Sequence, residues 1–145
     1  MSLSTFFLIA QWILDGFLVA LSFWAAFMVR FHSGWLSVGY LPPWEPYLIF
    51  AGIVVGAHGI VFKYAGLYRQ RRGISGVDEF SRIFLGTSTA SVLVAASTFL
   101  IRSFSFSRLV IVFTWVLAPV AVWAGRTMLR RIQVDLRRKG KGITR

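Results

Sequence analysis

Residues 5–29 read TFFLIAQWILDGFLVALSFWAAFMV, a run in which Asp15 is the only charged side chain. A helix rises about 1.5 Å per residue, so roughly 20 residues are needed to cross the hydrocarbon core of a bilayer, which is about 30 Å thick. The run is long enough to cross, and no Lys or Arg precedes it as one would in a secretory signal peptide. It therefore predicts a transmembrane helix that is retained in the mature protein.

Three further stretches lack Asp, Glu, Lys and Arg and are long enough to be spans: residues 46–62, 83–101 and 109–125. Together with the first run they predict an all-α, polytopic membrane protein whose four transmembrane helices form a bundle. The spans are expected at about residues 4–30, 45–65, 81–102 and 108–130. A kink is expected near Pro119 in the last span. Since only short connections remain, residues 1–145 are predicted to be one transmembrane domain without a sizeable soluble part.

The composition is apolar and basic: 57% of the residues are hydrophobic, and the formal net charge is +11. Charge alone would suit a nucleic-acid-binding protein. However, 13 of the 16 Lys and Arg residues fall in 63–82 and 126–145, which flank predicted spans, and Arg30, Arg102 and Arg108 are the remainder. Because basic loops stay in the cytoplasm, this pattern predicts two cytoplasmic termini, a basic tail at 131–145 and no nucleic-acid partner.

Residue types that carry catalysis or bind metals are sparse. The chain has no Cys, and its two His residues, His32 and His58, are far apart in the sequence. Disulfides, thiol nucleophiles and thiolate metal sites are therefore excluded, and no cluster of His and carboxylates predicts a metal. The sequence also lacks a phosphate-binding loop and a nucleophile–His–Asp arrangement. We predict no catalytic, cofactor-binding or metal-binding residue in this chain.

Asp15 is the residue that most needs a partner. It lies about 16 Å inside the first predicted span, near the middle of the membrane, where a charged Asp costs about 2.5–3.5 kcal/mol on insertion scales. Helix direction predicts a similar depth for His58, which is the first candidate partner, and Arg126 is the second. These three residues predict either a structural polar clasp or a proton or ligand site, and the usual behaviour of interhelical polar contacts favours the clasp.

Small residues at helical spacing in two spans predict close helix packing. They are Gly52, Gly56 and Gly59 in the second span and Thr87, Ser91 and Ala95 in the third. Asp78 and Glu79 precede the third span, where negative charge stabilises a helix N-terminus, so we predict capping in place of a catalytic acid–base pair.

The basic tail predicts contact with the lipid bilayer, in particular with anionic lipids, because each base near such a surface contributes about 1 kcal/mol. A narrower prediction is that the tail holds the phosphate of a lipid-linked substrate. The residues expected to make these contacts are Arg130, Arg131, Arg137, Arg138 and Lys139.

Several short motifs occur in a fixed order along the whole chain. They are Asp15, Arg30-Phe31, Ala65-Gly66-Leu67-Tyr68-Arg69, Asp78-Glu79, Ser107-Arg108 and the basic run from Arg126 to Lys141. In order and spacing they resemble the membrane domain of the large bacterial polyprenyl-phosphate hexose-1-phosphate transferases. The resemblance implies a multi-pass protein of the bacterial inner membrane that acts in exopolysaccharide or O-antigen biosynthesis.

Members of that family move a hexose 1-phosphate from a UDP-sugar to undecaprenyl phosphate. The resemblance implies that the catalytic region, with its Asp-Glu pair and its Mg²⁺, is missing from these residues, and Asp78-Glu79 is not that pair. The chain is then expected to be an anchoring domain, a fragment that is inactive alone, with undecaprenyl phosphate as a candidate partner.

Three alternatives remain open from the sequence. Membrane-bound sugar-nucleotide dehydratases and epimerases carry a similar four-helix head, although a Pro-Arg-Ser type of start is expected there in place of Ser107-Arg108. A small proton-coupled four-helix transporter would use a buried carboxylate such as Asp15. A polytopic interaction protein would dock a partner on its tail. Homo-oligomerisation is left open by all of these interpretations.

Overall fold

The computed structural model describes residues 3–69, 73–101 and 106–140. Within these ranges the chain forms four helices: α1 (Leu3–His32), α2 (Trp44–Tyr64), α3 (Gly76–Leu100) and α4 (Arg108–Arg138). All four are long and apolar enough to cross a membrane, which confirms the prediction of an all-helical chain with four candidate spans. Five of the Lys and Arg residues used to predict the orientation lie outside the described residues: Arg71, Arg72, Arg102, Lys141 and Arg145.

Two helix boundaries differ from the expected ones for local reasons. Helix α3 begins at Gly76 because the Ser75 hydroxyl accepts a hydrogen bond from the backbone N–H of Asp78 (3.2 Å) and caps the first turn, which holds Asp78 and Glu79. Helix α4 continues to Arg138 and so includes much of the stretch expected as a tail. Its last turns contain good helix formers, and Gly140, at a φ of 68°, follows where the helix has ended.

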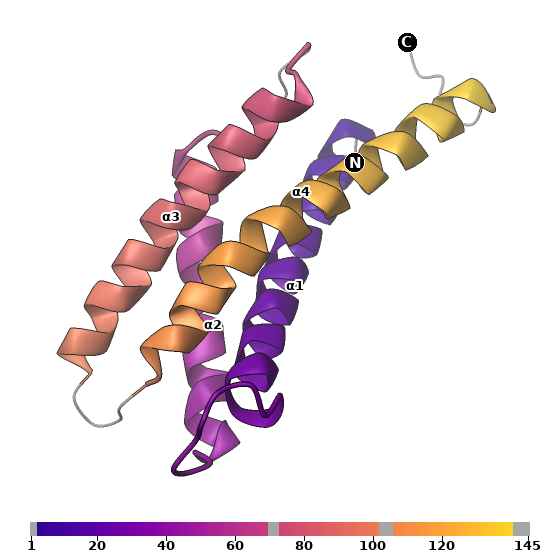
Figure 1. Ribbon diagram of the computed structural model, residues 1–145. Coiled ribbons are helices and arrows are strands. Elements are labelled where there is room, and N and C mark those ends of the chain that lie inside the picture. Colours follow the sequence, from indigo (N-terminus) through magenta and orange to yellow (C-terminus); the bar gives the residue numbers. More distant parts are fainter. Residues whose placement is uncertain (1–2, 70–72, 102–105, 141–145) are drawn as a thin grey trace.

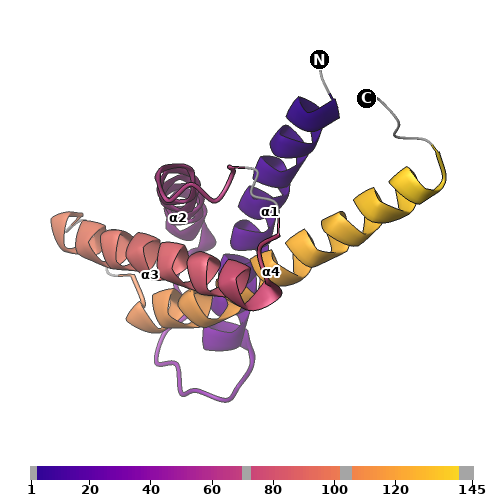
Figure 2. The same ribbon diagram turned by 90° about the horizontal axis from the view of Figure 1, so that it is seen from above.

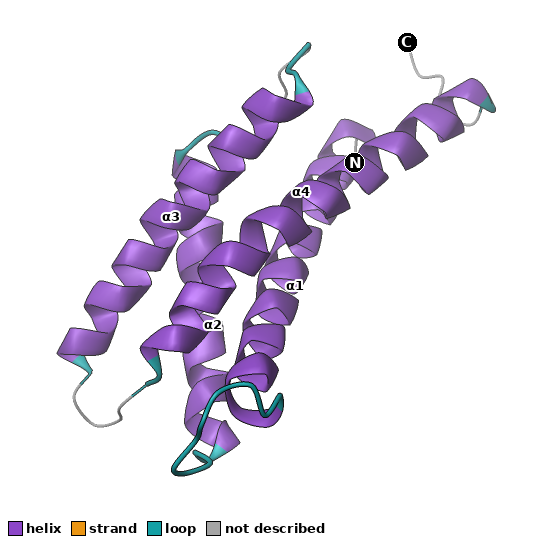
Figure 3. Cartoon of the chain, viewed as in Figure 1, coloured by secondary structure: helices purple, strands orange, loops and turns teal. Residues whose placement is uncertain are grey.

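Consecutive helices run antiparallel, and α4 packs back against α1, so each helix has two neighbours in the bundle (Figures 1 and 3). Both termini lie at the same end, together with the connection between α2 and α3 (Figure 1). Seen from above, the C-terminal part of α4 diverges from α2 and α3 and extends away from the bundle (Figure 2). One end of the molecule therefore gathers the start of α1, the end of α2, the start of α3 and the extension of α4.

Aromatic rings fill the bundle core near the opposite end. The rings of Phe50 and Phe106 stack with centroids 4.2 Å apart, and Phe27 and Tyr47 follow at 4.9 Å. The Tyr47 hydroxyl also accepts a hydrogen bond from the Ser107 N–H (3.0 Å), which links α2 to the start of α4. Large apolar side chains also cover the outside of the helices, an arrangement suited to surrounding hydrocarbon rather than to water.

The glycines at which an added Cβ would meet the nearest atoms are not the predicted ones. A Cβ on Gly125 of α4 would lie 2.3 Å from Leu18 of α1, and a Cβ on Gly86 of α3 would lie 3.1 Å from Phe62 of α2. Gly52 and Gly56 instead face open space, with no atom within 4 Å of an added Cβ. The prediction that these two residues pack against a neighbouring helix is therefore wrong within the described chain.

Candidate functional site

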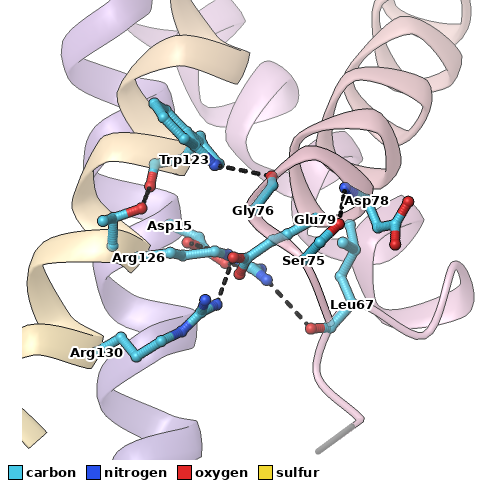
Figure 4. Close-up of polar contacts among 10 residues, drawn as sticks. Asp15, Leu67, Ser75, Gly76, Asp78, Glu79, Trp123, Arg126 and Arg130 are labelled. Carbon is cyan, nitrogen blue, oxygen red and sulfur yellow. Dashed lines mark hydrogen bonds and ion pairs between the residues drawn. The ribbon is translucent and has the colours of Figure 1, made fainter. Parts of the chain in front are cut away.

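A buried ion pair joins α1 to α4. The Arg126 guanidinium donates from Nε to Asp15 Oδ1 (3.2 Å) and from Nη2 to Asp15 Oδ2 (2.5 Å), which is a two-pronged contact (Figure 4). The exposed fractions of Asp15 and Arg126 are only 2% and 4%. A planar guanidinium matches a carboxylate in this geometry, and each charge offsets the cost of burying the other.

The expected pairing of Asp15 with His58 is wrong, and the second candidate, Arg126, is the partner. The ring of His58 bonds through Nδ1 to the carbonyl of Val54, one turn earlier in α2 (2.8 Å). Its Nε2 is buried without a hydrogen-bond partner among the described residues. The longer arginine side chain reaches across from α4, whereas the imidazole is held by its own helix.

The same guanidinium also holds the connection between α2 and α3. Arg126 Nη1 donates to the carbonyl of Leu67 (3.2 Å; Figure 4). The Cζ atom of Arg126 also lies 5.4 Å from the centre of the Tyr68 ring. Gly66, at a φ of 73°, makes the turn that precedes these two residues, a conformation that glycine adopts without strain. One side chain of α4 thus fixes α1 and the 65–69 segment together.

Asp15 lies closer to one end of the bundle than the sequence predicts. Helix α2 has 21 residues, or about 31 Å, which already equals the thickness of a hydrocarbon core. Leu67 follows the end of α2, and a single guanidinium bridges Leu67 to Asp15. Trp12 of α1 lies beside Gly59, which is five residues before the end of α2, so the first turns of α1 extend beyond α2. Counting from the start of α1 therefore overestimates the depth of Asp15.

A second ion pair lies one turn along α4, between Arg130 and Glu79 of α3. Glu79 is 8% exposed, so it is a partner as well as a first-turn residue of α3. The nearby Trp123 indole donates to the Gly76 carbonyl (3.2 Å) and adds a further link to α3 (Figure 4). The spacing of Arg126 and Arg130 on one face of α4 is the sequence signal that would have indicated this pair.

A polar cavity of about 440 Å³ opens beside the two ion pairs. Five arginines line it, from the 65–69 segment, α3 and α4: Arg69, Arg82, Arg126, Arg130 and Arg137. Of the five residues predicted to contact lipid, Arg130 and Arg137 line this cavity, whereas Arg131, Arg138 and Lys139 are exposed outside it. Arg69 and Arg82 were missed because nothing local in the sequence brings them near α4.

An apolar groove of about 500 Å³ lies between α1 and α2. It is lined mainly by residues of α1 between Trp12 and Val19 and of α2 between Val55 and Lys63. Tyr68 lines both the groove and the polar cavity. Tyr68 and the ion pair of Asp15 and Arg126 therefore lie at the border of the two hollows.

Tyr68 follows the end of α2 in the sequence and borders both hollows. Burial raises the pKa of Tyr68 well above its ordinary value of 10.0, and the negative charge of Asp15 raises it further. The unfolded chain loses this proton first as the pH rises. The stability that Tyr68 contributes is thus fully present below about pH 10 and is lost progressively above it.

Replacement of Tyr68 by Phe should make the protein less sensitive to alkali. The ring over Arg126 is kept, while the group that resists ionisation is removed. We expect the melting temperature of the parent protein to fall more than that of Tyr68→Phe between about pH 9 and pH 11. Thermal unfolding of both proteins in the same detergent measures this, and parallel curves would contradict the assignment.

The described residues contain no group of three or more His, Asp or Glu side chains that could hold a metal ion. A search of the chain against known protein families, curated proteins and solved structures found no match. The polar contacts that the structure describes at this site are two ion pairs and the hydrogen bonds around them.

Proposed function

We propose that this chain is the membrane-anchoring domain of a bacterial sugar transferase. Such an enzyme moves hexose 1-phosphate from a UDP-sugar to undecaprenyl phosphate in exopolysaccharide or O-antigen biosynthesis. One observation carries the proposal: residues from separate motifs that resemble this family meet in space. Asp15, Leu67-Tyr68 and Arg126 form one buried cluster, and Glu79 pairs one helical turn away.

The distribution of bases supports a cytoplasmic location for the end that carries both termini. Most Lys and Arg residues belong to the 63–82 and 126–145 segments, and those segments reach this end (Figure 1). A domain joined to the C-terminus would then lie in the compartment that holds UDP-sugars. A fluorescent reporter that folds only in the cytoplasm should be bright when fused after Gly140, and a dark fusion would contradict this topology.

The ion pair favours an anchor over a proton-coupled transporter. A carboxylate that carries protons must exchange them during the transport cycle, whereas both oxygens of Asp15 are engaged by Arg126. Reconstituted protein is therefore expected to show no pH-driven efflux of drugs or cations. Efflux by the parent protein that is lost in Asp15→Asn would support the transporter instead.

A domain exchange tests the proposed function directly. Residues 1–145 would replace the membrane domain of a large sugar transferase, and transfer from a radiolabelled UDP-sugar to undecaprenyl phosphate would be measured in membranes. We expect the chimera to retain transfer, and the chain alone to show none. An unrelated four-helix domain of the same topology serves as the matched control.

Two results would contradict the proposal. The first is transfer that is lost with this chain and retained with the unrelated domain. The second is transfer by the chain alone, which would reveal a catalytic site among these residues. The same exchange with the catalytic part of a membrane-bound sugar-nucleotide dehydratase tests the main alternative.

A further inference from the structure

We propose that the polar cavity and the apolar groove together form a binding site for one anionic glycerophospholipid. The phosphate would lie among the arginines of the cavity, and one acyl chain would lie in the groove. This inference goes beyond the anchoring role. It does not depend on that role, because the site is formed by residues of this chain alone and requires no attached catalytic domain.

The cavity carries an excess of positive charge. Arg126 and Arg130 are paired with Asp15 and Glu79. The other three arginines of the cavity, Arg69, Arg82 and Arg137, form no ion pair with any residue that the structure describes. Guanidinium groups bind phosphate oxygens in a forked geometry, and basic pockets at the cytoplasmic ends of membrane helices are suited to anionic headgroups.

The groove is shaped by missing side chains. Gly16 of α1 and Gly56 and Gly59 of α2 line it, and a Cβ on Gly56 would have no atom within 4 Å. Large apolar side chains, among them Trp12 and Ile60, complete its walls. A hydrocarbon chain can pack against these apolar side chains, which form most of the groove lining.

The order of the two hollows along the helices matches the order of the parts of a lipid. On α1 the cavity is lined by Phe7, Leu8 and Gln11, and the groove begins at Trp12 and continues to Val19. The cavity is therefore nearer the end that carries both termini, and the groove extends from it toward the bundle centre. A phospholipid in the adjoining leaflet presents its headgroup and its acyl chain in this same order.

The first test compares the binding of an anionic and a zwitterionic lipid, and the effect of removing two arginines at either end of the bundle. Purified protein of the full 145 residues would be titrated with phosphatidylglycerol and with phosphatidylcholine of identical acyl chains, in detergent, by native mass spectrometry. We expect preferential binding of phosphatidylglycerol. The double variant Arg69→Gln/Arg82→Gln should weaken that binding by about tenfold, since each base contributes a several-fold factor. Arg30→Gln/Arg108→Gln, which removes equal charge at the opposite end, should change it less than about twofold.

Two outcomes of this titration would overturn the proposal. One is an equal affinity for both lipids. The other is a loss in Arg131→Gln/Arg138→Gln that equals or exceeds the loss in the cavity variant, which would assign lipid binding to the exposed bases of α4. Melting temperatures of all variants establish that each one is folded at the temperature of the titration.

The second test concerns the acyl chain. Gly56→Leu would fill the groove, and it is expected to weaken phosphatidylglycerol binding by about fivefold or more. Gly52→Leu is the matched control, because Gly52 also faces open space on α2 but does not line the groove. Equal binding by both variants would overturn the groove as a chain site. Inorganic phosphate that displaces the lipid at similar concentrations would also overturn it, since the site would then recognise free phosphate alone.

Discussion

Replacement of Asp15 by Leu is expected to destabilise the bundle by about 3–5 kcal/mol, because the variant leaves the Arg126 guanidinium buried without its carboxylate. Arg126 is 4% exposed, and its other described contacts are the neutral carbonyl of Leu67 and the ring of Tyr68. Neither contact can replace a full negative charge beside a guanidinium that is so little exposed. Equilibrium unfolding of the purified protein in detergent measures this loss.

A double variant separates the value of the pair from the cost of an orphaned charge. Asp15→Leu/Arg126→Met removes both charges and keeps apolar packing, and such replacements of a buried pair are often neutral. We therefore expect the double variant to recover most of the stability that Asp15→Leu loses. Glu79→Gln is a milder control, because the Arg130 side chain is 51% exposed and such pairs contribute about 1 kcal/mol or less. A melting temperature for Asp15→Leu equal to that of the parent would show that water reaches Arg126.

The four spans could be predicted because length and apolarity are local properties of a stretch of sequence. The run around Asp15 and the charge-free stretch before Gly125 each show them directly. The partner of Asp15 could not be derived in this way. Asp15 and His58 line the same groove, as a similar depth predicts. The His58 ring is held by the Val54 carbonyl of its own helix, however, and Arg126 reaches Asp15 from α4.

The candidate site required a different kind of information. Arg126 and Arg130 share a face of α4, so two partners on neighbouring helices could have been expected from the sequence. The cavity could not have been predicted from the sequence. Arg69 and Arg82 come from segments whose approach to α4 depends on the turn at Gly66 and on the packing of α3. Gly52 and Gly56 show the converse, since their spacing is typical of packing but they face open space.

Gly125 is the position at which a small side-chain addition should do most damage to helix packing. An added Cβ would lie 2.3 Å from Cδ1 and 3.6 Å from Cγ of Leu18 on α1. The Leu18 side chain can move aside for a single methyl group, so Gly125→Ala should cost about 1 kcal/mol. Gly125→Val adds two more carbons at a site already in contact with α1, and we expect a loss of about 2–3 kcal/mol of unfolding free energy.

A compensating change identifies the cause of that loss. The double variant Leu18→Ala/Gly125→Val removes side-chain volume at residue 18 where valine adds it at residue 125. It should therefore be more stable than Gly125→Val, even though Leu18→Ala alone removes apolar packing. Gly52→Val is the matched control, because an added Cβ there meets no atom within 4 Å, and we expect its stability to change by less than about 0.5 kcal/mol. Thermal and denaturant unfolding of these four variants and of the parent protein would decide the matter. Equal losses for Gly125→Val and Gly52→Val would mean that backbone effects of glycine replacement, and not the close approach of α1 to α4, govern both positions.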